Sequence, residues 1–252
     1  MRRRRLAVLG AAGALAAGGA AFPWWGPPVL REVGWFDAAR IEVSGARLLA
    51  PHEVVSASGV RIGASIWTEP AAWEAALLRH PVIERATVER RLPATLRIRV
   101  VEKRPVALVA AGALRPATAA GELLPVDPVR VPVDLPLAGT APDSASRVTD
   151  PAVLRLLAEA ARLADADPVL MSRVSELAAG PEEGTVRLVL AHPRAEVLLP
   201  AGAAGAGLAQ LRATLDDVGR RLQPEGRARV DARFADQVVV RLPPPRSRTP
   251  NS

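Results

Sequence analysis

The chain of 252 residues contains no cysteine and no tyrosine, and it has one lysine and three histidines. Without cysteine it can form no disulfide, thiol nucleophile, iron–sulfur cluster or cysteine-based zinc site. The histidines, His52, His80 and His192, stand far apart in the sequence, so no two of them have the spacing of a helical metal site. We therefore expect no metal ion and no cofactor.

Motifs of known catalytic chemistry are also missing. The sequence has no G-x-S-x-G, H-E-x-x-H or P-loop motif, and the glycine-rich stretch 202–207 lacks the Lys-Ser/Thr that would follow it in a phosphate-binding loop. Asp165 and Asp167 have no evident third partner for acid–base or metal chemistry. We expect a protein that is not an enzyme, with no catalytic residue and no small-molecule substrate.

The net charge is +7 and the isoelectric point is near 11.3, values that by themselves suggest a nucleic-acid binder. The body of the chain is almost neutral, because much of the charge excess lies in two terminal groups: Arg2, Arg3, Arg4 and Arg5 at the start, and Arg246 and Arg248 at the end. Seven of the eight aromatic residues precede residue 74, whereas a stacking groove needs aromatics spread among the arginines. Nucleic acid is therefore not an expected partner.

An uncharged, mostly apolar run covers residues 6–22, between the N-terminal arginine cluster and the pair Trp24 and Trp25. As a helix it would measure roughly 26 Å, and the tryptophans would extend it at the membrane interface. By the positive-inside rule this pattern predicts a cytoplasmic tail over 1–5, a transmembrane anchor over 6–25 and a linker over 26–35. A cleaved signal peptide ending at the small residues 19–21 is the alternative, and the segment alone leaves both open.

Alternating apolar residues and turn residues predict a β-α-α-β-β unit after the linker. Pro51 starts one helix and Gly59 ends it, while Thr68 is the expected N-cap of the second, whose apolar stripe is Trp73, Ala76, Leu77 and His80. The expected strands and helices cover 40–44, 51–58, 69–80, 83–91 and 95–102.

The order of motifs in this unit resembles the POTRA domain of the FtsQ/DivIB bacterial division proteins. The strand that ends in Gly45 is followed by a helix ending at His80-Pro81-Val82, and then by a hairpin with Val88, Arg90 and Pro93. The stretch Glu102-x-Arg104-Pro105-Val106-Ala107 closes the pattern. The resemblance implies a POTRA domain over 36–104, and it favours an uncleaved anchor.

Residues 105–242 are predicted to form a second exported domain, and 243–252 a disordered tail. Short apolar pieces at 106–110 and 122–126 are broken by Gly112, Pro116 and Gly121, a pattern that predicts strands joined by loops. A helix with Asp150 as N-cap would bury a stripe of Val153, Leu154, Leu157, Ala161 and Ala164. Further strands are expected over 174–179, 185–190 and 195–199, a helix over 206–222, and a closing hairpin of 229–234 and 237–242.

The stretch 229–243 is similar to the closing strands of the FtsQ β domain through Val230, Asp231, Arg233 and Phe234. The fold class expected is thus α+β: a transmembrane helix, a small POTRA domain, and a mixed-sheet β domain with flanking helices. The resemblance implies a non-enzymatic, membrane-anchored scaffold at the division septum. Its implied partners are FtsB-like and FtsL-like bitopic division proteins and the septal wall-synthesis proteins. An exported POTRA-containing assembly factor and a cleaved, secreted enzyme are the alternatives.

The last strand is the expected binding site, because an unpaired edge can accept a strand from a partner. The residues proposed for it are Gln237, Val238, Val239, Val240 and Arg241, with Arg233 and Phe234 beside them. Val238 and Val240, or Val239 and Arg241, would select the partner's side chains. The edge of strand 83–91, with Glu89 and Arg91, is a second candidate, and an internal or shielded last strand is the alternative to the first.

A separate set of residues is expected to hold the chain in the membrane. The cluster of positive charge would keep the start of the chain in the cytoplasm, and the two tryptophans would lie at the opposite membrane interface. The expected membrane-anchor residues are Arg2, Arg3, Arg4, Arg5, Trp24 and Trp25.

Overall fold

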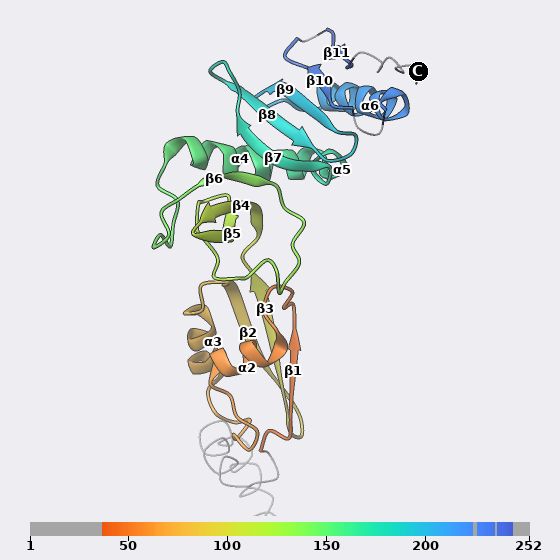
Figure 1. The fold of residues 1–252 in the computed structure, drawn as a ribbon. Coiled ribbons are helices and arrows are strands. Elements are labelled where there is room, and N and C mark those ends of the chain that lie inside the picture. The colour runs from red at the N-terminus through yellow and green to blue at the C-terminus, as the bar shows by residue number, and fades with distance from the viewer. Residues whose placement is uncertain (1–36, 224–225, 235, 244–252) are drawn as a thin grey trace, which may run out of the picture. The chain divides into compact units, whose positions relative to one another are not determined.

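The computed structural model of the protein describes residues 37–223, 226–234 and 236–243. Contacts between backbone positions divide the chain into two units, with the boundary between Lys103 and Arg104. The predicted tail, anchor and linker of the N-terminus lie outside the described residues, as does nearly all of the predicted C-terminal tail. Each unit has its own sheet (Figure 1).

The N-terminal unit has the predicted β-α-α-β-β order. Its sheet runs β1-β3-β2, with β3 parallel to β1 and antiparallel to β2. Alternation along β3 buries Leu96, Ile98 and Val100 on one face of the sheet, as the sequence predicts. The elements are β1 (Arg40–Ser44), α2 (Pro51–Ser58), α3 (Pro70–Leu78), β2 (Ile83–Arg91) and β3 (Thr95–Glu102).

The second helix is shorter than predicted at both ends. Glu69, and not Thr68, occupies the N-cap position, and the helix ends at Leu78. Pro81 disfavours helical backbone at the residue before it, so His80 lies outside the helix. The His80 Nδ1 instead accepts a hydrogen bond from the Val82 N–H at 3.3 Å.

Glu102, part of the closing motif of this unit, fastens the loop after β1. Its carboxylate accepts hydrogen bonds from the backbone N–H groups of Arg47, Leu48 and Leu49 at 2.8, 2.8 and 2.9 Å. A carboxylate that accepts hydrogen bonds from several backbone N–H groups satisfies donors that would otherwise have to bond to water. The motif residue therefore ties the end of β3 to the start of α2.

The C-terminal unit contains an eight-stranded mixed sheet in the order β11-β10-β9-β8-β7-β6-β4-β5. Its helices are α4 (Pro151–Ala166), α5 (Pro168–Met171) and α6 (Ala206–Arg221). The strands are β4 (Pro105–Ala111), β5 (Ala113–Thr118), β6 (Leu137–Thr140), β7 (Val174–Ala179), β8 (Thr185–Leu190), β9 (Ala195–Pro200), β10 (Ala228–Asp231) and β11 (Val239–Arg241).

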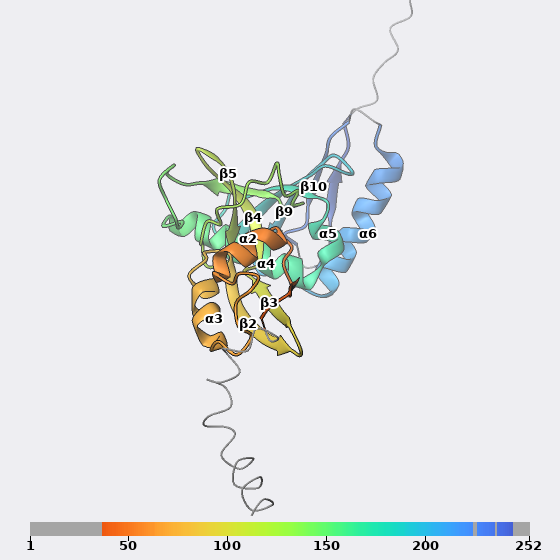
Figure 2. The same ribbon diagram turned by 90° about the horizontal axis from the view of Figure 1, so that it is seen from below.

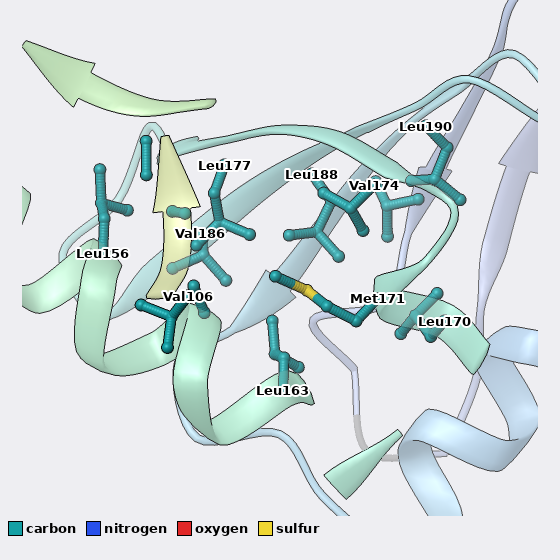
Figure 3. Close-up of a cluster of buried hydrophobic side chains, with 14 of the residues drawn as sticks. Val106, Leu156, Leu163, Leu170, Met171, Val174, Leu177, Val186, Leu188 and Leu190 are labelled. Atoms are coloured by element: carbon teal, nitrogen blue, oxygen red, sulfur yellow. The ribbon is translucent and has the colours of Figure 1, made fainter. Parts of the chain in front are cut away.

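One face of this sheet packs against all three helices. Alternate residues of β8, such as Val186, Leu188 and Leu190, are buried in one core cluster together with leucines of α4, α5 and α6. Figure 3 shows Leu163 of α4 and Met171 of α5 beside Leu188. The residues between the buried ones point to the opposite face, which carries none of the described helices and stays partly exposed.

The structure corrects the predicted stripe of α4. Val153 and Leu157 are buried as expected, but Leu156, Ala160 and Leu163 complete the buried face. The predicted Leu154, Ala161 and Ala164 are only partly buried. Leucines and alanines occupy most faces of this helix, so periodicity cannot choose among them, and the contacts with β4, β6 and β7 decide.

Two further predictions about the start of this unit are wrong. Strand β5 passes through Pro116, which the sequence pattern treats as a break; β5 ends the sheet, where a missing backbone donor is tolerated. Residues 122–126 form no strand but a segment with isolated bridges, such as that between Ala117 and Leu123. The short helix α5 was not predicted.

Polar contacts hold α6 and the loop before it to the rest of the unit. Asp167, at the junction of α4 and α5, is only 5% exposed and lies 3.2 Å from the Arg212 guanidinium of α6. Glu159 of α4 is also buried and accepts the Gly202 N–H at 3.1 Å. As a result α6 lies along the β9–β10 end of the sheet (Figure 2).

Candidate partner-binding edge of the C-terminal sheet

The sheet of the C-terminal unit ends at β11, which pairs antiparallel with β10. The register places Arg241 opposite Arg229, Val240 opposite Val230 and Val239 opposite Asp231. Among the described residues, no strand pairs with the other side of β11. The edge proposed from the sequence is thus at the end of the sheet.

The opposite edge of the same sheet is covered by the chain itself. The Leu124 N–H donates to the Pro116 carbonyl at 2.8 Å, and the Thr118 N–H donates to the Glu122 carbonyl at 3.0 Å. Segment 119–124 therefore folds back over β5. Proteins usually protect such edges, so the contrast between the two ends marks β11 as the accessible one.

The closing hairpin is shorter than predicted. Its strands are Ala228–Asp231 and Val239–Arg241, in place of 229–234 and 237–242. Of the residues proposed for the edge, Gln237 is exposed before the strand begins, and Val238 packs partly against the core. Only Val239, Val240 and Arg241 lie in the edge strand.

Arg233, two residues after the end of β10, contacts two carboxylates. Its Nε and Nη2 donate to the two carboxylate oxygens of Asp231 at 2.9 and 2.7 Å, and its Nη1 donates to Glu182. These contacts tie the chain after β10 to Glu182 in the turn between β7 and β8. Glu182 was not expected at this site, because it lies 51 residues from Arg233 in the sequence.

Asp231 and Arg233 shift each other's pKa. Hydrogen bonding from the Arg233 side chain lowers the pKa of Asp231 below its ordinary range. Hydrogen bonds to Asp231 and then to Glu182 raise the pKa of Arg233. Both groups are therefore charged in the folded protein at neutral pH.

A groove of about 650 Å³ runs over β9, β10 and β11 on the face that carries no helix. Arg233, Phe234, Val239 and Arg241, all proposed from the sequence, line it. Val240 alternates to the other face. The groove also contains residues that sequence reasoning missed: Glu196, Leu198, Arg229, Val230 and Asp231. The pairing of β9 with β10 places Glu196 and Leu198 there, and the pairing of β10 with β11 places the other three there.

Exposed apolar side chains gather at this end of the sheet. Phe234, the only aromatic residue after Trp73 in the sequence, is 48% exposed. Val239, Val240 and Leu242 are exposed as well. A cluster of this kind beside an open strand edge is typical of a protein interaction site.

The second candidate edge, β2, is partly occupied. It is the last strand of its sheet, but the Val88 N–H donates to the Glu74 carboxylate of α3 at 2.8 Å. Glu89 pairs with Arg99 across the sheet at 3.2 Å and so belongs to the sheet face. Arg91 is exposed near the tip of the hairpin. One backbone donor of the β2 edge is therefore already used by the chain itself.

Two other expectations concern sites elsewhere in the chain. No helix within the described residues is long and apolar enough to span a membrane. Within the same part of the chain, no three His, Cys, Asp or Glu side chains are grouped as metal ligands. The residues proposed for the membrane anchor all lie outside the described residues, so their role stays a prediction: Arg2, Arg3, Arg4, Arg5, Trp24 and Trp25.

The Asp231–Arg233 pair predicts a defined loss of stability in acid. Because the folded pKa of Asp231 lies below the unfolded one, its contribution is fully present above the unfolded pKa and is lost as the pH falls through the folded pKa. Urea midpoints of the natural chain and of Asp231→Asn should therefore differ at neutral pH and converge in acid. A difference that stays constant down to about pH 2 would contradict this assignment.

Comparison with known proteins agrees with the architecture. Residues 36–103 match the family model "POTRA domain, FtsQ-type". The chain is 36% identical over 147 residues to the cell division protein FtsQ of Anaeromyxobacter sp. (strain K), covering 52% of this chain and 48% of that protein. It is 43% identical over 70 residues to the cell division protein DivIB of Geobacillus kaustophilus, covering 27% of each.

A third relative matches over a greater length. The cell division protein FtsQ of Rhodothermus marinus is 33% identical over 246 residues, which cover 86% of this chain and 84% of that protein. The first two matches span half or less of those relatives, whereas this one includes both units of the chain. The chain belongs to the FtsQ/DivIB family of cell division proteins.

Proposed function

We propose that this protein is a membrane-anchored scaffold of the division site, without catalytic activity, that holds other bitopic division proteins and links them to septal peptidoglycan synthesis. The observation that carries the proposal is the unpaired edge of β11 beside an apolar and charged groove. FtsB-like and FtsL-like proteins are the proposed partners. The family supports the role in cell division, and the edge supports the mode of binding.

The proposed mechanism is addition of a partner strand to β11. Backbone hydrogen bonds along the edge supply affinity that depends little on side chains, and alternating side chains supply selectivity. Val239 and Arg241 face the groove, whereas Val240 faces the other side of the sheet. The side chains of a partner segment would therefore be recognised mainly by the groove on one face.

The residues that line the groove indicate the chemistry of that segment. Arg229 and Arg241 lie directly opposite each other, a like-charge pair that is unfavourable by itself. Glu196 lies opposite Arg229 on β9, but its carboxylate pairs with Arg187 of β8 at 3.4 Å. A partner strand with an acidic side chain near Arg241 and an apolar one near Val239 and Phe234 would complement the site.

The proposed location is the inner membrane at the septum, with the N-terminus in the cytoplasm and both units exported. The arginine cluster and the apolar run of the N-terminus support this topology. A fluorescent fusion of the full chain should concentrate at the septum of dividing cells, and the protein should stay with the membrane fraction. Free release together with a mature N-terminus near Phe22 would instead support the cleaved, secreted form.

A further inference from the structure

One end of the POTRA unit exposes large apolar side chains that do not pack in its own core. Ile62, in the loop between α2 and α3, is 74% exposed, and Leu92, in the β2–β3 turn, is 66% exposed. They are the two most exposed large apolar residues among the described residues of this unit. Exposed apolar residues at the tips of two separate loops suggest a surface that they contact.

Hydrogen bonds to the start of β1 bring the two loops to the same end of the unit. The Gly63 N–H donates to the Ala38 carbonyl at 2.9 Å, and the Ala38 N–H donates to the Ala64 carbonyl at 2.8 Å. On the other side, the Ala39 N–H donates to the Ala94 carbonyl at 2.8 Å. Figure 1 shows the start of β1, the α2–α3 loop and the β2–β3 turn together at this end.

Arg90 holds the α2–α3 loop in place. Its Nε donates to the Ile66 carbonyl at 2.7 Å and its Nη2 to the Thr68 carbonyl at 3.2 Å. The guanidinium also lies over the Trp67 ring, 5.9 Å from the centroid. The α2–α3 loop that carries Ile62 is therefore fixed to β2 by Arg90.

An exposed arginine lies directly beside each of the two apolar tips. Arg61 precedes Ile62 and Arg91 precedes Leu92, and both arginines are exposed. Arg40 and Arg90 belong to the strands behind them, and the acidic residues nearby are Asp37, Glu69 and Glu42, which interacts with Arg40 and Arg91. Arginines that flank apolar side chains suit the phosphate level of a bilayer, where the apolar groups enter the acyl boundary.

We propose that this end of the POTRA unit docks on the anionic lipid surface of the membrane that anchors the chain, with Ile62 and Leu92 entering the interface. The inference rests on the anchor of the proposed function. Residues 26–36, which separate Trp25 from the described chain, could span at most roughly 40 Å even when fully extended, so the loops remain within reach of the bilayer. Contact through two loops would fix the orientation of the unit on the membrane.

The absence of native cysteine makes a direct test possible. The full chain carrying Ile62→Cys, labelled with an environment-sensitive fluorophore, is reconstituted as single copies in lipid nanodiscs. Ser44→Cys, exposed at the opposite end of β1, is the matched control. In discs with anionic phosphatidylglycerol, the label at position 62 should emit at shorter wavelength and be protected from iodide quenching, and the label at 44 should not.

Lipid charge and the flanking arginines provide the second arm of the test. The protection should fall in purely zwitterionic discs, and Arg61→Ser and Arg91→Ser should each lower the inserted population about fivefold in anionic discs. Equal quenching at positions 62 and 44 overturns the proposal. Protection that does not depend on lipid charge and appears only when a disc holds several chains also overturns it. In that case a second copy of the chain would cover Ile62.

Failure of the anchor has a different signature. A chain that does not remain in the discs shows that the proposed topology is wrong. The same labelled chain mixed with phosphatidylglycerol vesicles then tests the docking by itself, and an unshifted label at position 62 in that mixture refutes it.

Discussion

A proline in the outward-facing position of β11 should lower the affinity for the partner on the order of 100-fold, because the ring removes a backbone donor and obstructs the incoming strand. Successive N–H groups of a strand point to opposite sides, so one of Val239 and Val240 faces β10 and the other faces outward. Val239→Pro and Val240→Pro are therefore made as a pair. The informative variant is the one that keeps the melting temperature of the natural chain.

Binding is measured by titration with purified FtsB-like and FtsL-like proteins of the same organism. Val239→Thr serves as the control, since it keeps the backbone donor and the β-branched shape, and it should bind with an affinity close to that of the natural chain. A folded chain with proline at the outward position and unchanged affinity would exclude strand addition at β11. Binding lost equally in Val239→Thr would place the recognition in side chains.

Gly45→Ala is expected to destabilise the POTRA unit by about 2–5 kcal/mol. The residue has a φ of 87°, a left-handed conformation that costs an L-residue about 1–2 kcal/mol. In addition, a Cβ at this position would lie 2.0 Å from the Val100 carbonyl oxygen of β3. That atom belongs to the backbone of the central strand, so relief requires a shift of the sheet and adds about 1–3 kcal/mol or more.

Gly59 offers a matched control for this substitution. It also has a positive φ, of 72°, but a Cβ there would meet nothing within 4 Å. Gly59→Ala should therefore show only the conformational cost of about 1–2 kcal/mol. Urea denaturation followed by tryptophan fluorescence measures both, because Trp67 and Trp73 lie in this unit. Equal losses in the two variants would show that the contact with Val100 does not contribute.

The POTRA unit could be predicted in detail because its signals are local. Glycine and proline separate short segments of clear periodicity, and β1, α2, β2 and β3 have the predicted bounds. The α4 face was misjudged for the opposite reason, since alanine and leucine occupy several faces of that helix and Leu163 cannot be distinguished from Ala164 by periodicity. There the pattern was compatible with more than one orientation.

The candidate site was predicted as a strand but not as a surface. The motif residues Arg233 and Phe234 identified the hairpin, and the order of the sheet places it at an end. The groove beside it could not be predicted, because Glu196 reaches it only through the pairing of β9 with β10, and Glu182 reaches Arg233 only through the turn after β7. Contacts between residues so distant in sequence leave no local pattern.

The sequence by itself determined the order of strands and helices in the POTRA unit, the absence of cysteine chemistry and the position of most strands, because turn residues and periodicity act within a few residues of the chain. Only the tertiary structure decided which strand edge stays open and why Gly45 must lack a side chain. It also decided that Ile62 and Leu92 lie at the same end of the POTRA unit. These properties arise where segments distant in sequence are brought together by backbone hydrogen bonds and packing.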